Sequence, residues 1–216
     1  EVFPSNNLEL ALWMESERLL HPVINKIGVD TQNEVVKEEK RTRMDNQPYG
    51  RFQAVVKENL FKKHPYRWAT IGSMEHLDAA TLEEFQAFNK KFYIPNNAVL
   101  VVAGDFKKDQ AKKWIAQYFG TIPKGAPIKR EQFIEEPITE TIKARFEDNN
   151  IQIPAIVAAY RTPSMKTRDA RVLDLISSYL SDGKSSKLYK KIVDDKKIAL
   201  QVGAFSNSQE DYGMYI

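Results

Sequence analysis

The sequence contains no cysteine, which excludes disulfide frameworks, thiolate zinc sites and cysteine nucleophiles. It also lacks any apolar run of the ~18 residues that a membrane-spanning helix requires. The longest such run, residues 98–103, has the length of a strand. Neither sign of charge prevails, because 32 Lys and Arg are interleaved with 29 Asp and Glu. The sequence therefore predicts neither a membrane span nor a nucleic-acid partner.

Aromatic residues are frequent, with three Trp, nine Tyr and eleven Phe among 216 residues. A chain of this composition buries a core and is not disordered. Apolar residues at three- and four-residue steps predict that the first ~95 residues are almost all helical. The expected helices cover residues 8–21, 31–45, 51–61, 82–92, 109–119, 168–180 and 185–193. Asp30 or Thr31 is expected to cap the second of these helices, and Asp78 or Thr81 the fourth.

Short apolar or alternating runs in the second part of the chain predict strands between the later helices. The strongest is the continuous run at 98–104, which predicts a strand that is buried on both faces. Asn149 and Asn150 predict a tight return between two further strands. The expected strands cover residues 98–104, 141–147, 152–160 and 199–205, and a last one starts at 212. This order is typical of an α+β fold rather than of a repeating βαβ sheet.

Motifs of common catalytic and phosphate-binding sites are absent. The three histidines, His21, His64 and His76, have no spacing that would place two of them on one helix face. No glycine-rich phosphate loop opens a helix, and no GxSxG elbow is present. We interpret the histidines as surface residues or as residues that pack in loops.

Three carboxylates on the second predicted helix form the best candidate site. Helical spacing places Glu39 on the same broad face as Val35 and Val36, whereas Glu34 and Glu38 lie nearer its flank. A carboxylate beside valines is costly to bury unless it is paired or bound to a cation. Spacing alone does not choose between Glu38 and Glu39.

The alternative interpretation is a solvated helix face. In that case Glu34 and Glu38 pair with neighbouring basic residues such as Lys37 and Arg41, and the cluster binds no ligand. The spacing of the residues allows both interpretations.

Eight segments, in order, resemble the pitrilysin/insulinase (M16) family of zinc peptidases, specifically its bacterial processing-protease branch. Each segment is weak evidence by itself, but together they extend over almost the whole chain. The segments are residues 3–13 with 15–18, then 34–41, 45–50, 64–66, 71–77, 93–98, 158–163 and 183–189.

The resemblance implies a zinc site that this chain only partly contains. In the family, an HxxEH helix supplies two His ligands for Zn²⁺ and a Glu that activates the water, and a more distant Glu is the third protein ligand. That ligand corresponds to Glu39, and Gln32, two helical turns earlier, corresponds to a residue that orients it. HxxEH is absent here and belongs upstream in the family. We therefore expect this chain to be a fragment that is inactive alone.

The resemblance also implies architecture and partners. The fold is expected to be α+β, with metalloprocessing-peptidase-like two-layer units of helices packed on a mainly antiparallel sheet. Residues 1–94 would be the mostly helical remainder of the metal-bearing unit, and residues 95–216 a truncated second unit. A second M16-like half, in the same protein or on another chain, and a peptide or unfolded polypeptide substrate complete the prediction. A non-catalytic, substrate-holding partner subunit is the alternative, and a periplasmic or cell-envelope location is favoured.

Overall fold

The computed structural model describes all residues, 1–216. Contacts between residues group them into two compact units, which are described separately. Unit 1 comprises Glu1–Arg41 and Ile71–Gln132, and unit 2 comprises Thr42–Thr70 and Phe133–Ile216. The domain boundary expected after residue 94 stays a prediction.

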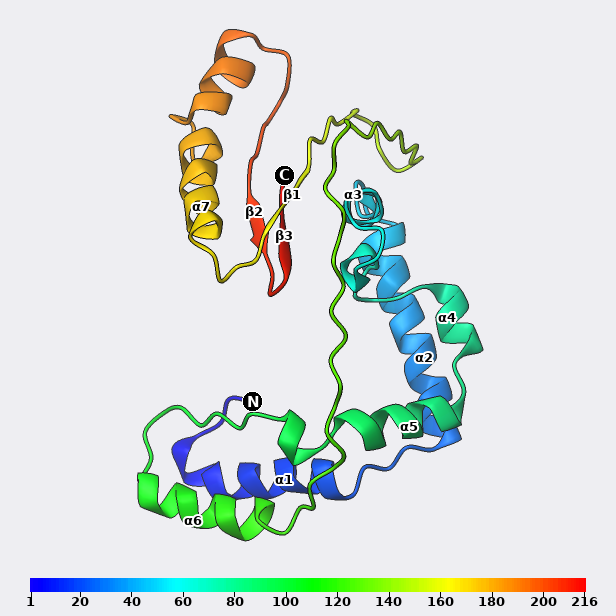
Figure 1. Ribbon diagram of the computed structural model, residues 1–216, viewed down its shortest axis with the longest axis vertical. Coiled ribbons are helices and arrows are strands. Elements are labelled where there is room, and N and C mark those ends of the chain that lie inside the picture. Colours follow the sequence, from blue (N-terminus) through cyan, green and yellow to red (C-terminus); the bar gives the residue numbers. More distant parts are fainter. The chain divides into compact units, whose positions relative to one another are not determined.

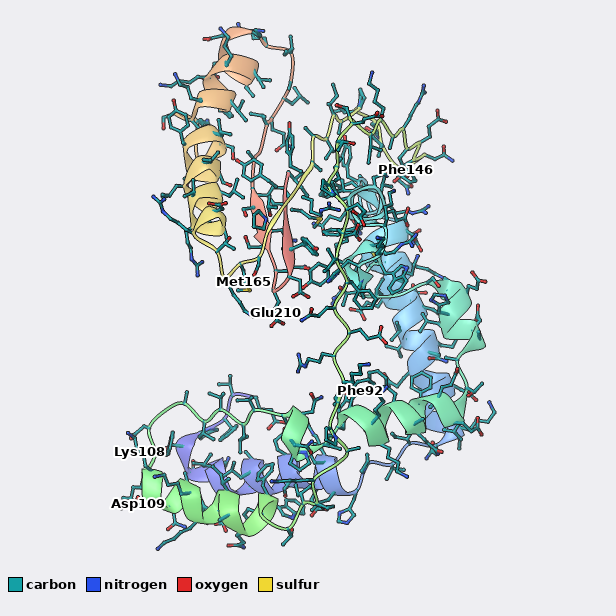
Figure 2. The ribbon with its side chains drawn as sticks, viewed as in Figure 1. Phe92, Lys108, Asp109, Phe146, Met165 and Glu210 are labelled. Atoms are coloured by element: carbon teal, nitrogen blue, oxygen red, sulfur yellow. The ribbon has the colours of Figure 1, made fainter.

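Unit 1 is built from helices. The hydrophobic core lies where α1 packs along α6, around Leu8, Leu12 and Ala111, and Figure 1 shows these two helices side by side. The second helix, α2, contacts α4 and α5. The helices of this unit are α1 (Leu8–Leu20), α2 (Lys26–Lys40), α4 (Met74–Ala79), α5 (Leu82–Phe92) and α6 (Lys108–Phe119), with 3₁₀ turns at Ser5–Asn7 and Pro95–Asn97. Lys108 and Asp109 mark the start of α6 in Figure 2.

Capping residues explain where two helices begin. The expected start of α2 after Asp30 or Thr31 was wrong: the helix begins at Lys26, because the Asn25 side chain accepts a hydrogen bond from the Gly28 N–H at 2.8 Å. Of the two suitable caps for α5, the structure uses Thr81. Its hydroxyl accepts from the Glu84 N–H, and the Glu84 carboxylate accepts from the Thr81 N–H, which forms a capping box.

Unit 2 combines helices with a small sheet. The three strands are antiparallel in the order β1-β3-β2, and Met214 of β3 lies opposite Arg161 on one side and Asn207 on the other. Helix α7 contacts β1 and β2. The elements are α3 (Phe52–Leu60), a 3₁₀ turn (Pro65–Arg67), β1 (Tyr160–Pro163), α7 (Arg168–Ser181), a π-helical segment (Tyr189–Asp195), β2 (Ser206–Ser208) and β3 (Tyr212–Tyr215). A further π-helical turn, Arg41–Asp45, follows α2 in the chain.

Polar contacts hold the corner between β1 and α7 against the turn between β2 and β3. The Met165 N–H donates to the Gln209 carbonyl at 2.8 Å. Lys166 and Glu210 form an ion pair at 3.0 Å, and Met165 and Glu210 are labelled at this corner in Figure 2. Helices with a small antiparallel sheet confirm the predicted α+β fold class. None of the helices is both long and apolar enough to cross a bilayer.

Four of the five strand predictions were wrong in this structure, whereas the strand expected from residue 212 is confirmed as β3. Residues 98–103 are extended but have no partner strand, and Val99 is 89% exposed. Residues 141–147 and 152–159 form no hairpin ladder, although a turn does occur at 149–150, where the Ile151 N–H donates to the Asp148 carbonyl. The strand expected at 199–205 lies later in the chain, since β2 begins at Ser206. Strand pairing depends on a partner, and within residues 1–216 the segments 98–103, 141–147 and 152–159 have none.

Candidate functional site

Helix α2 carries the predicted site residues in different environments. The side chains of Glu34 and Glu38 are 68% and 65% exposed, whereas Glu39 is half-buried. Gln32, two turns before Glu39, is exposed. Val35, on the same face, is 53% exposed, so this face is only partly covered in the chain.

The flank carboxylates of α2 make the ion pairs expected for a solvated face. The Lys37 Nζ lies 2.7 Å from a carboxylate oxygen of Glu34 and 2.5 Å from one of Asp78. Asp78 belongs to α4. Hydrogen bonds from Lys37 to Asp78 and then to Glu34 raise the pKa of this amine. Arg41 lies 3.1 Å from Glu38. The solvated-face interpretation therefore describes Glu34 and Glu38.

The chain by itself forms no complete metal site. No group of three or more His, Asp or Glu side chains is placed to hold a metal ion. Zinc sites in proteins normally use four donors, and catalytic sites keep three protein ligands. A carboxylate can be a zinc ligand, and Glu39, which is half-buried, would supply at most one of the three.

The structure also contains a buried ion pair in unit 2 that the sequence did not predict. The side chain of Glu135 is 2% exposed and that of Arg161 is 11% exposed, and their charged atoms lie 3.2 Å apart. One oxygen of Glu135 accepts hydrogen bonds from three consecutive backbone N–H groups, those of Lys62, Lys63 and His64, at 2.6–2.8 Å. A single carboxylate thus joins the chain after α3 to the start of β1.

Opposing effects act on the acidity of Glu135. Burial by itself raises the pKa of this carboxyl, but the N–H groups of His64, Lys63 and Lys62 and the charge of Arg161 outweigh it. The net effect lowers the pKa below its ordinary value of 4.5. Glu135 is therefore ionised in the folded protein at neutral pH.

Aromatic rings enclose the same region. His64 is buried, and its ring lies 4.0 Å from that of Tyr66 and 5.4 Å from that of Tyr212, measured between centroids. Its Nε2 lies 3.3 Å from an Asp211 carboxylate oxygen. The Arg161 guanidinium lies over the Tyr212 ring at 5.6 Å. His64 is thus a loop-packing residue, as expected, while His21 and His76 are exposed.

Sequence reasoning missed Glu135 because nothing in its neighbourhood marks it. The residue lies in the segment 120–137, a connection without regular helix or strand. The one available hint was Arg161, a cationic residue that directly follows an apolar run and lies in one of the segments that resemble the M16 family.

Solved structures of bacterial proteases share the fold of this chain. A protease from Helicobacter pylori superposes over 99% of this chain and 52% of its own, with a TM-score of 0.80 and 26% identity. The first half of the periplasmic protease PqqL from Escherichia coli superposes over 98% of this chain and 46% of its own, with a TM-score of 0.69 and 19% identity. The chain thus shares its fold with parts of longer bacterial proteases.

The family follows from the sequence. A family model described as the peptidase M16 inactive domain matches residues 79–216, and the chain belongs to the peptidase M16 family. This confirms the resemblance.

Curated bacterial proteins are similar to this chain in sequence. The zinc protease PqqE of H. pylori is 27% identical over 215 residues, which are 97% of this chain and 48% of that protein. A non-peptidase homolog of H. pylori, YmxG, is 24% identical over 152 residues, or 70% of this chain and 35% of that protein. The chain spans about half the length of the curated relatives with which it aligns throughout.

Proposed function

We propose that this chain is part of a zinc metalloendopeptidase that hydrolyses peptides or unfolded polypeptides. The parent protein is the longer protein to which the chain would belong. The observation that carries the proposal is the similarity, over 97% of the chain, to a relative named a zinc protease. Because the family model describes residues 79–216 as an inactive domain, the metal chemistry would depend on residues 1–78 and on parts of the parent outside this chain.

Within this proposal Glu39 is the third zinc ligand. Its half-buried position on α2 separates it from the exposed Glu38, and shielding from water strengthens a bond between a carboxylate and a cation. Gln32 lies on the same face and would orient Glu39 through its amide without adding charge. When bound, zinc would polarise the substrate carbonyl and make water a better nucleophile. The HxxEH residues of the parent would supply the two remaining ligands and the general base.

A second M16-like half is the expected partner. The similar PqqL fragment is itself described as the first half of its protein, which supports an arrangement of two related halves. PqqL is also described as periplasmic, and we extend this to the present protein by proposing the cell envelope as its location.

The isolated 216-residue chain is expected to have no peptidase activity and to bind zinc weakly or not at all, because one carboxylate does not hold zinc against water. The parent protein should cleave an unfolded polypeptide, lose this activity with a chelator and regain it with zinc. Peptide cleavage and zinc content of the two proteins, measured side by side, test the proposal. Chelator-sensitive turnover by the isolated chain, or a zinc-free parent with full activity, would contradict it.

The second candidate is a non-catalytic, substrate-holding partner subunit. It is favoured by one observation, the relative named a non-peptidase homolog. The two functions differ in the HxxEH sequence of the parent protein. Intact histidines there support the peptidase, and substituted histidines support the partner subunit.

A further inference from the structure

Residues 184–197, which lie between α7 and β2, carry six lysines and no arginine. All six side chains are exposed. Between Gly183 and Asp194 the chain has four lysines and no carboxylate, whereas over the whole chain 32 basic residues are interleaved with 29 acidic ones. Figure 1 shows this segment in orange, beyond the C-terminal end of α7. We call the six residues the lysine surface: Lys184, Lys187, Lys190, Lys191, Lys196 and Lys197.

The ammonium groups of the lysine surface have no partner within residues 1–216. Other exposed lysines of the chain form ion pairs, such as Lys26 with Asp30 at 2.8 Å and Lys166 with Glu210 at 3.0 Å. None of the six lysines makes an ion pair or a side-chain hydrogen bond. The six lysines and the two aspartates of residues 184–197 leave a net charge of +4. This charge is therefore available to an anionic partner.

The same segment also carries apolar side chains that are shielded from water. A π-helical stretch, Tyr189–Asp195, forms its central part. Leu188 and Ile192 are half-buried, whereas Lys187 and Lys191, which precede them in the chain, are exposed. The exposed face of an ordinary surface helix carries charges of both signs. An amphipathic stretch with lysines alone on its exposed face is typical of a segment that binds a membrane surface.

We propose that the lysine surface docks the protein on a membrane that carries anionic phospholipid headgroups. Lysine is a compact, strongly hydrated charge without the planar fork by which arginine binds one fixed ligand, so lysines alone suit a fluid array of phosphates. Each lysine near an anionic leaflet strengthens binding roughly fivefold. Nucleic acid is a less suitable partner because single strands stack on exposed aromatic rings, and Tyr189, the one aromatic residue of the segment, is half-buried.

This inference goes beyond the proposed peptidase function and does not depend on it. A cell-envelope location, as proposed above, would bring the lysine surface within reach of a bilayer. Attachment of this kind is reversible and weakens as salt screens the charges. Loss of membrane binding and loss of peptide cleavage are thus separate results.

Sedimentation of the parent protein with vesicles tests the docking directly. Vesicles of equal parts phosphatidylglycerol and phosphatidylcholine are expected to bind the protein at an ionic strength of about 0.1 M. They should release it at about 1 M, because the Debye length falls from about 10 Å to about 3 Å. Vesicles of phosphatidylcholine alone should not bind it. No binding to the anionic vesicles, or equal binding to the neutral ones, would overturn the proposal.

Two matched variants of the parent protein locate the binding surface. The test variant combines Lys184→Gln, Lys187→Gln, Lys190→Gln and Lys191→Gln. Its partition onto anionic vesicles should fall at least about 50-fold, close to that onto neutral vesicles. The control removes the same charge at the start of α6, where the lysines are exposed but interspersed with aspartates, and should lower the partition far less. The control variant combines Lys107→Gln, Lys108→Gln, Lys112→Gln and Lys113→Gln.

The melting temperatures of both variants should equal that of the unsubstituted protein, because all the replaced side chains are exposed. Equal losses of vesicle binding in the two variants would show that net charge alone governs binding, and would overturn the proposal. Binding of soluble polyglutamate without binding of anionic vesicles would assign the lysine surface to an acidic polypeptide, which also overturns it. If the test variant does not fold, the single substitution Lys187→Gln takes its place and should weaken vesicle binding roughly fivefold.

Discussion

Replacing Glu39 by Gln in the parent protein is expected to lower kcat/KM for an unfolded polypeptide by more than about 100-fold. The substitution keeps the size of the side chain and removes the negative charge that zinc would bind. Mutation of a residue that merely supports a metal ligand already lowers metal affinity or activity 10–100-fold. Loss of a ligand itself should lower them at least as much. Activity and zinc content should fall together.

Glu38→Gln is the matched control for this experiment. Glu38 lies next to Glu39 on the same helix, but its side chain is 65% exposed and is paired with Arg41. Its neutralisation should change kcat/KM by no more than about twofold, as surface substitutions usually do. Unchanged melting temperatures would show that both variants fold. Full activity of the Glu39 variant, or equal losses in both variants, would remove Glu39 from the proposed zinc site.

Replacing Glu135 by Ala in the 216-residue chain is expected to lower the free energy of unfolding by about 3–5 kcal/mol, the usual cost of breaking a buried ion pair. The substitution leaves the Arg161 charge and three backbone N–H groups without their acceptor. A loss of this size corresponds to a decrease in melting temperature of about 10 °C for a chain of this length. Urea denaturation followed by circular dichroism measures it.

Glu136→Ala provides the comparison at the next position. Glu136 is 78% exposed and pairs with Lys63 at 2.9 Å on the surface, and exposed pairs contribute little to stability. A small change at 136 with a large one at 135 would support the buried ion pair as the contact that holds β1 to the chain after α3. Similar small changes at both positions would show that this pair does not stabilise unit 2.

The pH dependence of stability should report on the same carboxylate. The pKa of Glu135 is lowered in the folded protein, so its stabilising contribution is complete above the ordinary value of 4.5. The contribution decreases as the pH falls below that value towards the lowered one. Glu135→Gln should flatten this acid loss of stability, and Glu136→Gln should do so less because its carboxylate is exposed. Identical acid profiles of the Glu135 variant and the unsubstituted chain would contradict this assignment.

The helices are the part of this protein that the sequence determined by itself. The periodicity of Leu8 and Leu12 and the Thr81 capping signal act within one or two helical turns, so α1, α5, α6 and α7 lie close to where they were expected. The eight segments that resemble the M16 family were also sufficient to predict the family, which the match to its model confirms. The choice of Glu39 and Gln32 came from that resemblance and stays a prediction.

Only the tertiary structure decided the contacts that depend on distant partners. Glu135 and Arg161 are 26 residues apart and meet 3.2 Å from one another because a connecting segment returns to β1, and no local pattern contains that information. The apolar run at 98–103 predicted a strand, but within residues 1–216 it has no neighbour to pair with. Helices satisfy their hydrogen bonds locally, whereas strands and buried charges need partners that only the folded chain brings together.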